Sequence, residues 1–185
     1  MSSINFGGLI DVQVTRRPDK TAIITPDGSW TYRELHDKVQ SIAARLSDDG
    51  IGVGDRVALL GYNSKEYVAT LLAVYRVGAI AVPINYRLQR DELNHLVTDS
   101  GATAAFADAE LVVDLEQALG GAASAFKVRI CLDGDGLEGW ESFCSVVVAE
   151  SGRTVPLARV GHQSVQRIMY TNGTTSRPKG AMITH

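Results

Sequence analysis

The chain has 185 residues, of which 45% are hydrophobic and 21% charged, a composition typical of a globular protein with one sizeable core. Its net charge is −3 and its basic residues are scattered, which argues against a nucleic-acid-binding or anionic-lipid-binding surface. No apolar run approaches the ~20 residues that a helix needs to cross a bilayer, so no transmembrane segment is expected.

The first predicted elements are a hairpin and a helix. Strands 22–25 and 29–30 flank Pro26-Asp27-Gly28, which has good turn chemistry. Thr31 and Glu34 then have the spacing of a capping box, and apolar residues recur at steps of three and four as far as Leu46. This pattern predicts an amphipathic helix that ends near Gly50.

Beyond this helix, short apolar runs alternate with helical periodicity. Gly78 and Gly101 each follow a predicted helix, at a position where a left-handed backbone costs glycine least. The polar segment 151–164 is interpreted as a connection. We predict strands at 56–61, 79–84, 103–107, 127–132 and 165–171, and helices at 64–77, 90–100, 110–119 and 137–150. Near-continuous apolar strands alternating with helices indicate an α/β fold, with a mostly parallel sheet covered by helices on both faces.

The two cysteines, Cys131 and Cys144, have neither the paired spacing of a metal site nor a histidine cluster nearby. We interpret both as buried structural thiols, with Cys144 in the helix predicted at 137–150. Unpaired thiols are typical of a reducing compartment, so the sequence favours a cytoplasmic protein.

The residues that point to a chemistry follow the last predicted strand. Residues 171–180 read Thr-Asn-Gly-Thr-Thr-Ser-Arg-Pro-Lys-Gly, a loop of hydroxyls, glycines and one lysine. Backbone amides exposed by glycine, hydroxyl donors and a positive charge together solvate phosphate oxygens. The order is not that of the Walker loop, because Lys179 precedes Gly180 and residues 181–184 are predicted to be extended. Composition alone favours an ordinary surface loop rich in turn residues.

The order of these residues resembles the signature of the adenylate-forming superfamily, which reads Ser/Thr-Ser-Gly-Thr-Thr-Gly-x-Pro-Lys-Gly and occurs in acyl-CoA synthetases, luciferases and the adenylation domains of peptide synthetases. Segment 82–88, Val-Pro-Ile-Asn-Tyr-Arg-Leu, looks more like the acyl-CoA synthetase branch than the peptide-synthetase branch. Further segments stand in the family's order at 17–22, 30–35, 53–58 and 78–85.

The resemblance implies an acyl-CoA ligase whose loop holds the β- and γ-phosphates of ATP while a carboxylate attacks the α-phosphate. The product is an acyl-adenylate, which then yields an acyl-CoA thioester. ATP, Mg²⁺ and coenzyme A are implied as cofactors or co-substrates, and a small carboxylic acid as substrate. A homo-oligomer is left open, because these residues do not determine the oligomeric state. No catalytic residue or metal ligand is assigned. The phosphate-binding residues carried over from the signature are Thr171, Asn172, Gly173, Thr174, Thr175, Ser176, Lys179 and Gly180.

Two positions depart from the signature. Asn172 replaces the usual serine and keeps a donor, whereas Ser176 replaces a glycine. If that position needs a positive φ, serine adds strain of about 1 kcal/mol; otherwise its hydroxyl is one more donor. We expect weaker or rearranged phosphate contacts, not their loss.

The resemblance covers nearly the whole chain, which would then be the N-terminal part of the large adenylation domain, residues 1–185, ending just after the phosphate loop. Members of the superfamily continue with an acyl pocket, an acidic residue that binds the ribose, a hinge and a small domain with a catalytic lysine. We therefore expect a parent acyl-CoA ligase and no activity from these residues alone. The alternative is a non-catalytic truncated module used for scaffolding or dimerisation.

The remaining polar residues suggest no second site. The four histidines are dispersed and are interpreted as surface or partly buried residues, with the role of His185 left open. Asp133, Asp135 and Glu138 lie near glycines but lack the spacing of a calcium loop.

Overall fold

The computed structural model of the chain describes residues 5–171 and 177–185. Its centre is a seven-stranded sheet in the order β7-β6-β5-β3-β4-β8-β9, in which neighbours are parallel except for the antiparallel pair β8 and β9. This confirms the prediction of a mostly parallel sheet. The strands are β3 (Arg56–Leu60), β4 (Ile80–Ile84), β5 (Ala104–Ala107), β6 (Val128–Cys131), β7 (Glu141–Ser142), β8 (Val165–Thr171) and β9 (Lys179–Thr184).

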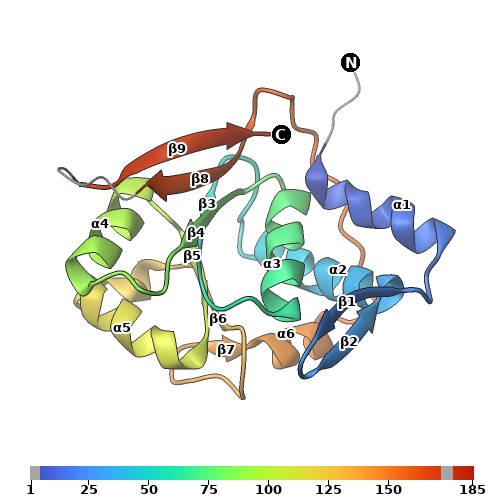
Figure 1. Cartoon of the computed structure of the whole chain (residues 1–185), viewed down its shortest axis with the longest axis horizontal. Coiled ribbons are helices and arrows are strands. Elements are labelled where there is room, and N and C mark those ends of the chain that lie inside the picture. Colours follow the sequence, from blue (N-terminus) through green and yellow to red (C-terminus); the bar gives the residue numbers. More distant parts are fainter. Residues whose placement is uncertain (1–4, 172–176) are drawn as a thin grey trace.

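Helices cover both faces of the sheet, as predicted (Figure 1). Helices α1, α2, α3 and α6 lie on one face, and α4 and α5 on the other. Short 3-10 turns occur at Phe6–Gly8 and Ala122–Ala125. The helices are α1 (Leu9–Arg16), α2 (Tyr32–Asp48), α3 (Lys65–Arg76), α4 (Arg90–Ser100), α5 (Ala109–Leu119) and α6 (Phe143–Ala149). None of the helices within 5–171 and 177–185 combines the length and the hydrophobicity of a membrane span.

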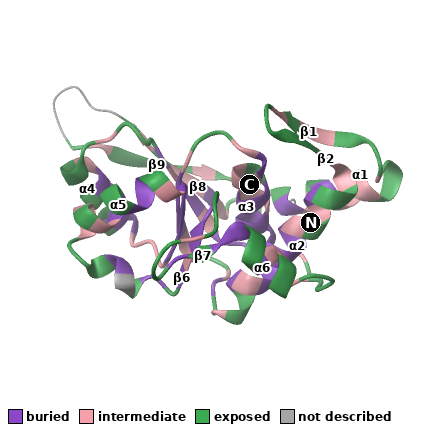
Figure 2. Cartoon of the chain, turned by 90° about the horizontal axis from the view of Figure 1, so that it is seen from below, coloured by how far each residue is buried: buried purple, intermediate pink, exposed green. Residues whose placement is uncertain are grey.

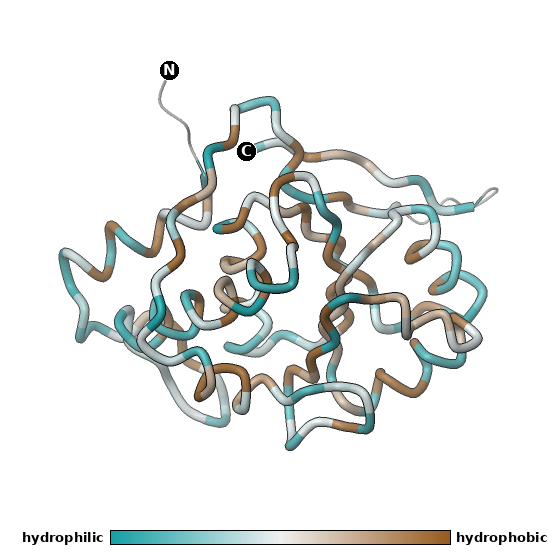
Figure 3. The backbone as a smooth tube through the Cα atoms, turned by 180° about the vertical axis from the view of Figure 1, so that it is seen from behind, coloured by the Kyte–Doolittle hydropathy of each residue, from teal (hydrophilic) through white to brown (hydrophobic). Residues whose placement is uncertain are grey.

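The central strands β3, β4, β5 and β6 are mostly apolar on both faces, which explains why they read as continuous hydrophobic runs. Along β3, Val57 and Leu59 belong to the core beneath α2 and α3, whereas Ala58 and Leu60 belong to the core beneath α4 and α5. The central strands are the most buried part of the molecule (Figure 2), and the outer turns are mostly hydrophilic (Figure 3).

The hairpin and its following helix form as predicted. Strands β1 (Thr21–Thr25) and β2 (Gly28–Thr31) pair antiparallel, apart from the main sheet. The Thr31 hydroxyl accepts the Glu34 amide at 3.2 Å, and the Glu34 carboxylate accepts the Thr31 amide at 2.7 Å. This capping box satisfies donors that the first turn of α2 would otherwise leave unpaired.

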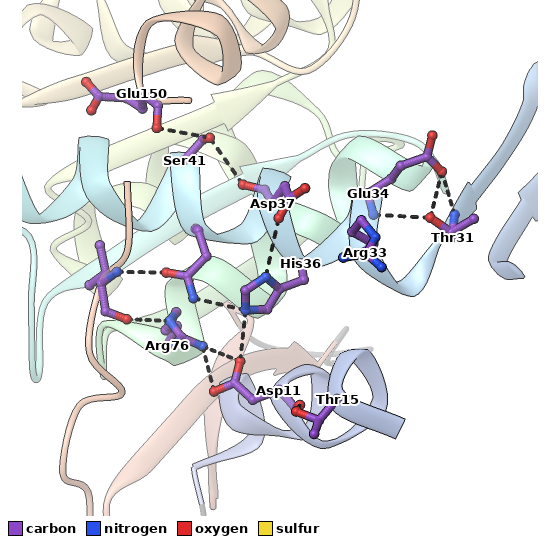
Figure 4. A network of polar contacts seen from close by, with 12 residues as sticks. Asp11, Thr15, Thr31, Arg33, Glu34, His36, Asp37, Ser41, Arg76 and Glu150 are labelled. Atoms are coloured by element: carbon purple, nitrogen blue, oxygen red, sulfur yellow. Dashed lines mark hydrogen bonds and ion pairs between the residues drawn. The ribbon is translucent and has the colours of Figure 1, made fainter. Parts of the chain in front are cut away.

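A polar network attaches α1 and the connection 151–164 to the core (Figure 4). The buried Arg76 guanidinium donates to the Asp11 carboxylate at 2.8 and 3.1 Å and to the Val155 carbonyl at 2.7 Å. The Gln40 side chain accepts the Val155 amide at 2.7 Å. The connection lacks helix and strand, as predicted, yet side chains from α2 and α3 hold it in place.

The helix predicted at 137–150 is wrong in its first half. Gly136 and Gly139 have positive φ, a bridge joins Leu137 and Trp140, and the short strand β7 follows before α6 begins at Phe143. The Trp140 indole donates to Glu116 of α5 at 2.8 Å. Apolar residues in this stretch therefore form a turn that contacts α5. The spacing of apolar residues in the sequence does not reveal this contact.

Two further findings differ from the sequence predictions. Helix α1 was not predicted, and Ile10 is its one buried residue. Cys131 is buried as expected, but Cys144 is exposed, because the correct helix α6 turns it away from the core residues Phe143 and Val146. Gly78 and Gly101 have the left-handed φ values that were predicted for them.

Candidate functional site

The candidate phosphate-binding residues lie on and between strands β8 and β9. These strands form a hairpin in which Thr171 pairs with Lys179 and Tyr170 pairs with Gly180. Lys179 and Gly180 thus belong to a strand, whereas the predicted loop extended to Gly180. The other predicted residues, Asn172, Gly173, Thr174, Thr175 and Ser176, lie outside the described residues.

Thr171 and Lys179 lie opposite each other where the two strands open into the loop. Both side chains are exposed, and the Thr171 hydroxyl is 3.5 Å from the Lys179 carbonyl. Because side chains alternate along a strand, both lie on the face opposite to Tyr170 and Gly180. A hydroxyl donor and an ammonium group therefore share one accessible face, an arrangement suited to an oxyanion.

Gly180 is required by packing. A Cβ atom at this position would lie 2.7 Å from Ile168 Cγ2 and 3.2 Å from the Tyr170 ring. Ile168 and Tyr170 both pack against the core beneath α4 and α5. The missing side chain of Gly180 therefore makes room for two β8 side chains on that face.

Helix α4 lies beside the end of the hairpin at which β8 leads into the loop and β9 begins (Figure 1). The Tyr170 hydroxyl donates to Asp99 Oδ2 at 2.7 Å, and His95 Nε2 lies 3.2 Å from the Pro178 carbonyl oxygen. Burial, followed by this bond to the carboxylate, raises the pKa of Tyr170. A cleft of about 450 Å³ lies between α4 and Arg177 and Pro178.

These α4 residues were not predicted as part of the site. His95 is partly buried, as expected for a dispersed histidine, but 83 residues separate it from Pro178 and 71 separate Asp99 from Tyr170. No sequence motif joins residues so far apart. The contacts exist because β8 pairs with β4, the strand that precedes α4.

A second polar feature lies at the carboxyl ends of β3 and β5, where the following helices leave toward opposite faces of the sheet. In α/β proteins such a point often holds a ligand. Here the buried Asp108 accepts the Tyr62 amide at 2.6 Å and would contact any Cβ at Gly61. Burial raises the pKa of Asp108. The carboxylate therefore holds the loop after β3.

The acidic residues after β6 are structural where they have contacts. Asp133 accepts the Ala109 amide at 2.6 Å, at the start of α5. Within the part of the chain that the structure describes, no three His, Cys, Asp or Glu side chains gather as a metal site would require. The candidate site thus consists of the hairpin and its α4 contacts.

Comparison with known proteins matches residues 10–185 to a family described as AMP-binding enzyme. The indoleacetate–CoA ligase of Aromatoleum aromaticum is 34% identical over 94% of this chain and 34% of its own length. The feruloyl-CoA synthase of an Amycolatopsis species is 36% identical over 91% of this chain and 31% of its own length.

The fold is likewise shared with a solved structure. The anthranilate CoA ligase AuaEII, in complex with anthranoyl-AMP, superposes with a TM-score of 0.91 at 25% identity, over 98% of this chain and 35% of the ligase. The chain spans about a third of the length of each of these relatives. All three are named as CoA ligases or synthases, in agreement with the branch that residues 82–88 indicated.

Proposed function

This chain belongs to the AMP-binding enzyme family, and we propose that a protein containing it converts a carboxylic acid into an acyl-CoA thioester. The acid's oxygen attacks the α-phosphorus of ATP and the bond to pyrophosphate breaks, giving an acyl-adenylate. The thiol of coenzyme A then attacks the acyl carbon and AMP leaves. The relatives named above act on different acids, so the proposal is for this reaction class and for no particular acid.

Within this reaction, we assign the β8–β9 hairpin to the phosphates of ATP. The carrying observation is that Thr171 and Lys179 present a hydroxyl and an ammonium group on one exposed face. The proposed set remains Thr171, Asn172, Gly173, Thr174, Thr175, Ser176, Lys179 and Gly180. Phosphoryl chemistry depends on positioning and charge stabilisation, which these groups supply.

The described residues fit the phosphates better than they fit a metal. An exposed ammonium and a hydroxyl attract an oxyanion, whereas a bound Mg²⁺ needs oxygen ligands and commonly reaches proteins with the nucleotide. Mg²⁺ would supply charge compensation on the phosphates. In this proposal the chain's own groups orient the leaving pyrophosphate.

The test compares Lys179→Ala with Lys179→Arg in the full-length enzyme that contains this chain. Loss of one donor to a developing charge lowers rates by ~10²–10³, so Lys179→Ala should lower kcat/KM for ATP by about that factor. The assay is carboxylate-dependent exchange of pyrophosphate into ATP. Lys179→Arg keeps the charge and should lose less.

Lys127→Ala is the matched control, because Lys127 is also an exposed lysine but lies before β6. It should behave as the unaltered enzyme does. Full exchange activity in the Lys179→Ala enzyme would remove the support for a phosphate-binding hairpin.

We further propose that these 185 residues do not catalyse adenylation alone, since the resemblance implies catalytic groups outside them. Purified chain should show no carboxylate-dependent exchange. The rival function, a non-catalytic module, is favoured by the departures at Asn172 and Ser176. If ATP protects Lys179 from chemical acetylation, this rival is opposed. If ATP does not change the acetylation of Lys179, the rival is favoured.

We also propose a cytoplasmic location, which the free thiols Cys131 and Cys144 support.

A further inference from the structure

Helix α4 contacts both strands of the hairpin next to the loop, through two residues that are one helical turn apart. Asp99 accepts a hydrogen bond from Tyr170 at the end of β8, at 2.7 Å. His95 lies 3.2 Å from the carbonyl oxygen of Pro178, immediately before β9. A carbonyl oxygen only accepts hydrogen bonds, so His95 donates from Nε2 and carries its proton there.

The spacing of two residues one turn apart on a helix is close to the spacing of two paired strands. Residues four apart on a helix have Cβ atoms ~6 Å apart on one face, and neighbouring strands lie ~4.8 Å apart. One turn of α4 therefore spans the width of the β8–β9 pair. A single rigid helix thus holds the ends of both strands, which fixes their separation at the loop opening.

The held residues are the direct neighbours of the candidate phosphate ligands. Tyr170 precedes Thr171, and Pro178 precedes Lys179. The Tyr170 ring also packs against the core beneath α4, next to Gly180. Fixing Tyr170 and Pro178 from one face of the hairpin leaves Thr171 and Lys179 directed to the other.

We propose that His95 and Asp99 are positioning residues for phosphate binding: by holding Tyr170 and Pro178, they set the distance and direction at which Thr171 and Lys179 meet the nucleotide. This inference rests on the proposed function of the hairpin. His95 and Asp99 need not touch the nucleotide, so their effect passes through the backbone of β8 and β9.

The test measures KM for ATP, for the acid and for coenzyme A in the full-length enzyme. His95→Leu and Tyr170→Phe each remove one hydrogen bond, and a hydrogen bond of ordinary net strength corresponds to about a three- to tenfold change. KM for ATP should rise by that factor in each variant. KM for the acid and for coenzyme A should stay within about twofold, which a general loss of structure would not allow.

Conservative variants make the test specific. His95→Gln retains a donor near Nε2, and Asp99→Asn retains an acceptor. Both variants should therefore keep KM for ATP within about twofold of that of the unaltered enzyme. The matched controls are His162→Leu, at an exposed histidine, and Asp135→Asn, at an exposed carboxylate after β6. Neither should change KM for ATP.

Amide hydrogen exchange reads the hairpin without any nucleotide. The amides of Lys179, Gly180 and Ala181 should exchange faster in His95→Leu and Tyr170→Phe than in the controls. Unchanged exchange together with unchanged KM for ATP would overturn the inference. So would a His95→Gln enzyme as impaired as His95→Leu.

The two proposals fail separately. If Lys179→Ala impairs exchange of pyrophosphate but the α4 variants leave KM for ATP unchanged, the hairpin binds phosphate and α4 does not position it. If Lys179→Ala is fully active, the phosphate role of the hairpin fails, whatever the α4 variants do to exchange of the β9 amides.

Discussion

At Gly180 in the candidate site, the neighbouring side chains leave no room for a Cβ atom. Tyr170 lies across from it on β8, and Ile168 lies beside both. Glycines in a strand commonly mark a close approach of this kind, and a cross-strand aromatic ring often covers them. The signature glycine therefore serves the packing of the hairpin, in addition to any contact with phosphate.

We predict that Gly180→Val destabilises the hairpin. The added side chain overlaps Ile168 and Tyr170, and overpacking of this kind costs about 1–3 kcal/mol. Amide exchange in β9 should accelerate, and KM for ATP should rise in the full-length enzyme. Gly52→Ala is the control, because no atom lies within 4 Å of a Cβ at Gly52 and its φ is not positive. A Gly180→Val protein with unaltered β9 exchange contradicts this packing role.

We expect Tyr67 on α3 to make the protein less stable at alkaline pH. Burial raises its pKa to about 12, because the phenolate is poorly solvated beside the core. Tyr67 ionises near pH 10 in the unfolded chain and near pH 12 in the folded chain. Between these pH values, unfolding therefore releases a proton from Tyr67. The stability present below pH 10 is therefore lost as pH rises from 10 to 12.

The corresponding prediction concerns Tyr67→Phe. Its free energy of unfolding should fall less steeply between pH 10 and 12, by ~1–2 kcal/mol over that interval. Urea unfolding at pH 8, 10, 11 and 12 measures the difference. Tyr86→Phe, at an exposed tyrosine, is the control and should keep the slope of the parent chain. Equal slopes for Tyr67→Phe and the parent would show that Tyr67 does not cause the loss.

Helix α3 joins two separate segments of the chain through one side chain. Arg76 at its last turn bonds Asp11 of α1 and the carbonyl of Val155 in the connection 151–164. Without the guanidinium, that carbonyl loses its side-chain donor and Asp11 loses its cation (Figure 4). A buried arginine therefore links α1 and the connection 151–164 to α3.

We predict that Arg76→Leu lowers the free energy of unfolding by ~2 kcal/mol, since it leaves partly buried polar groups unpaired. Arg90→Leu is the matched control. Arg90 forms an exposed ion pair with Asp114 at 3.6 Å, and such pairs contribute ~1 kcal/mol or less. Chemical denaturation of both variants measures the difference, and equal losses would contradict the role assigned to Arg76.

Most elements could be predicted because their signals are local. The capping box at Thr31 and the glycines after α3 and α4 act within a few residues, and the structure confirms them. The errors occur where distant contacts decide the conformation. Trp140 lies in a turn, where it is buried in the core beneath α4 and α5 and its indole N–H donates a hydrogen bond to Glu116 on α5. Helix α1 forms although Ile10 is its one buried residue.

The two apolar layers of the molecule share one sheet. Phe106 of β5 is fully buried in the layer beneath α2 and α3, and its neighbours Ala105 and Ala107 face the other layer. Both layers therefore contain residues of the same strands.

We predict that Phe106→Ala destabilises the chain by about 3–5 kcal/mol, the usual cost of a buried phenylalanine. If the two layers unfold together, far-ultraviolet circular dichroism and tryptophan fluorescence should report a single shared transition. Ile24→Ala, at a residue 79% exposed on β1, should change the midpoint little. Two separate transitions in the Phe106→Ala protein would show that the layers unfold independently.

Residue order alone was sufficient to predict the fold class, the strand and helix alternation and the family resemblance, because these depend on short-range patterns of apolar, capping and signature residues. Membership of the AMP-binding enzyme family agrees with that resemblance. The contacts of His95 with Pro178 and of Asp99 with Tyr170 followed no such pattern. They depend on which strands pair across the sheet, since the parallel pairing of β4 and β8 brings α4 beside the hairpin.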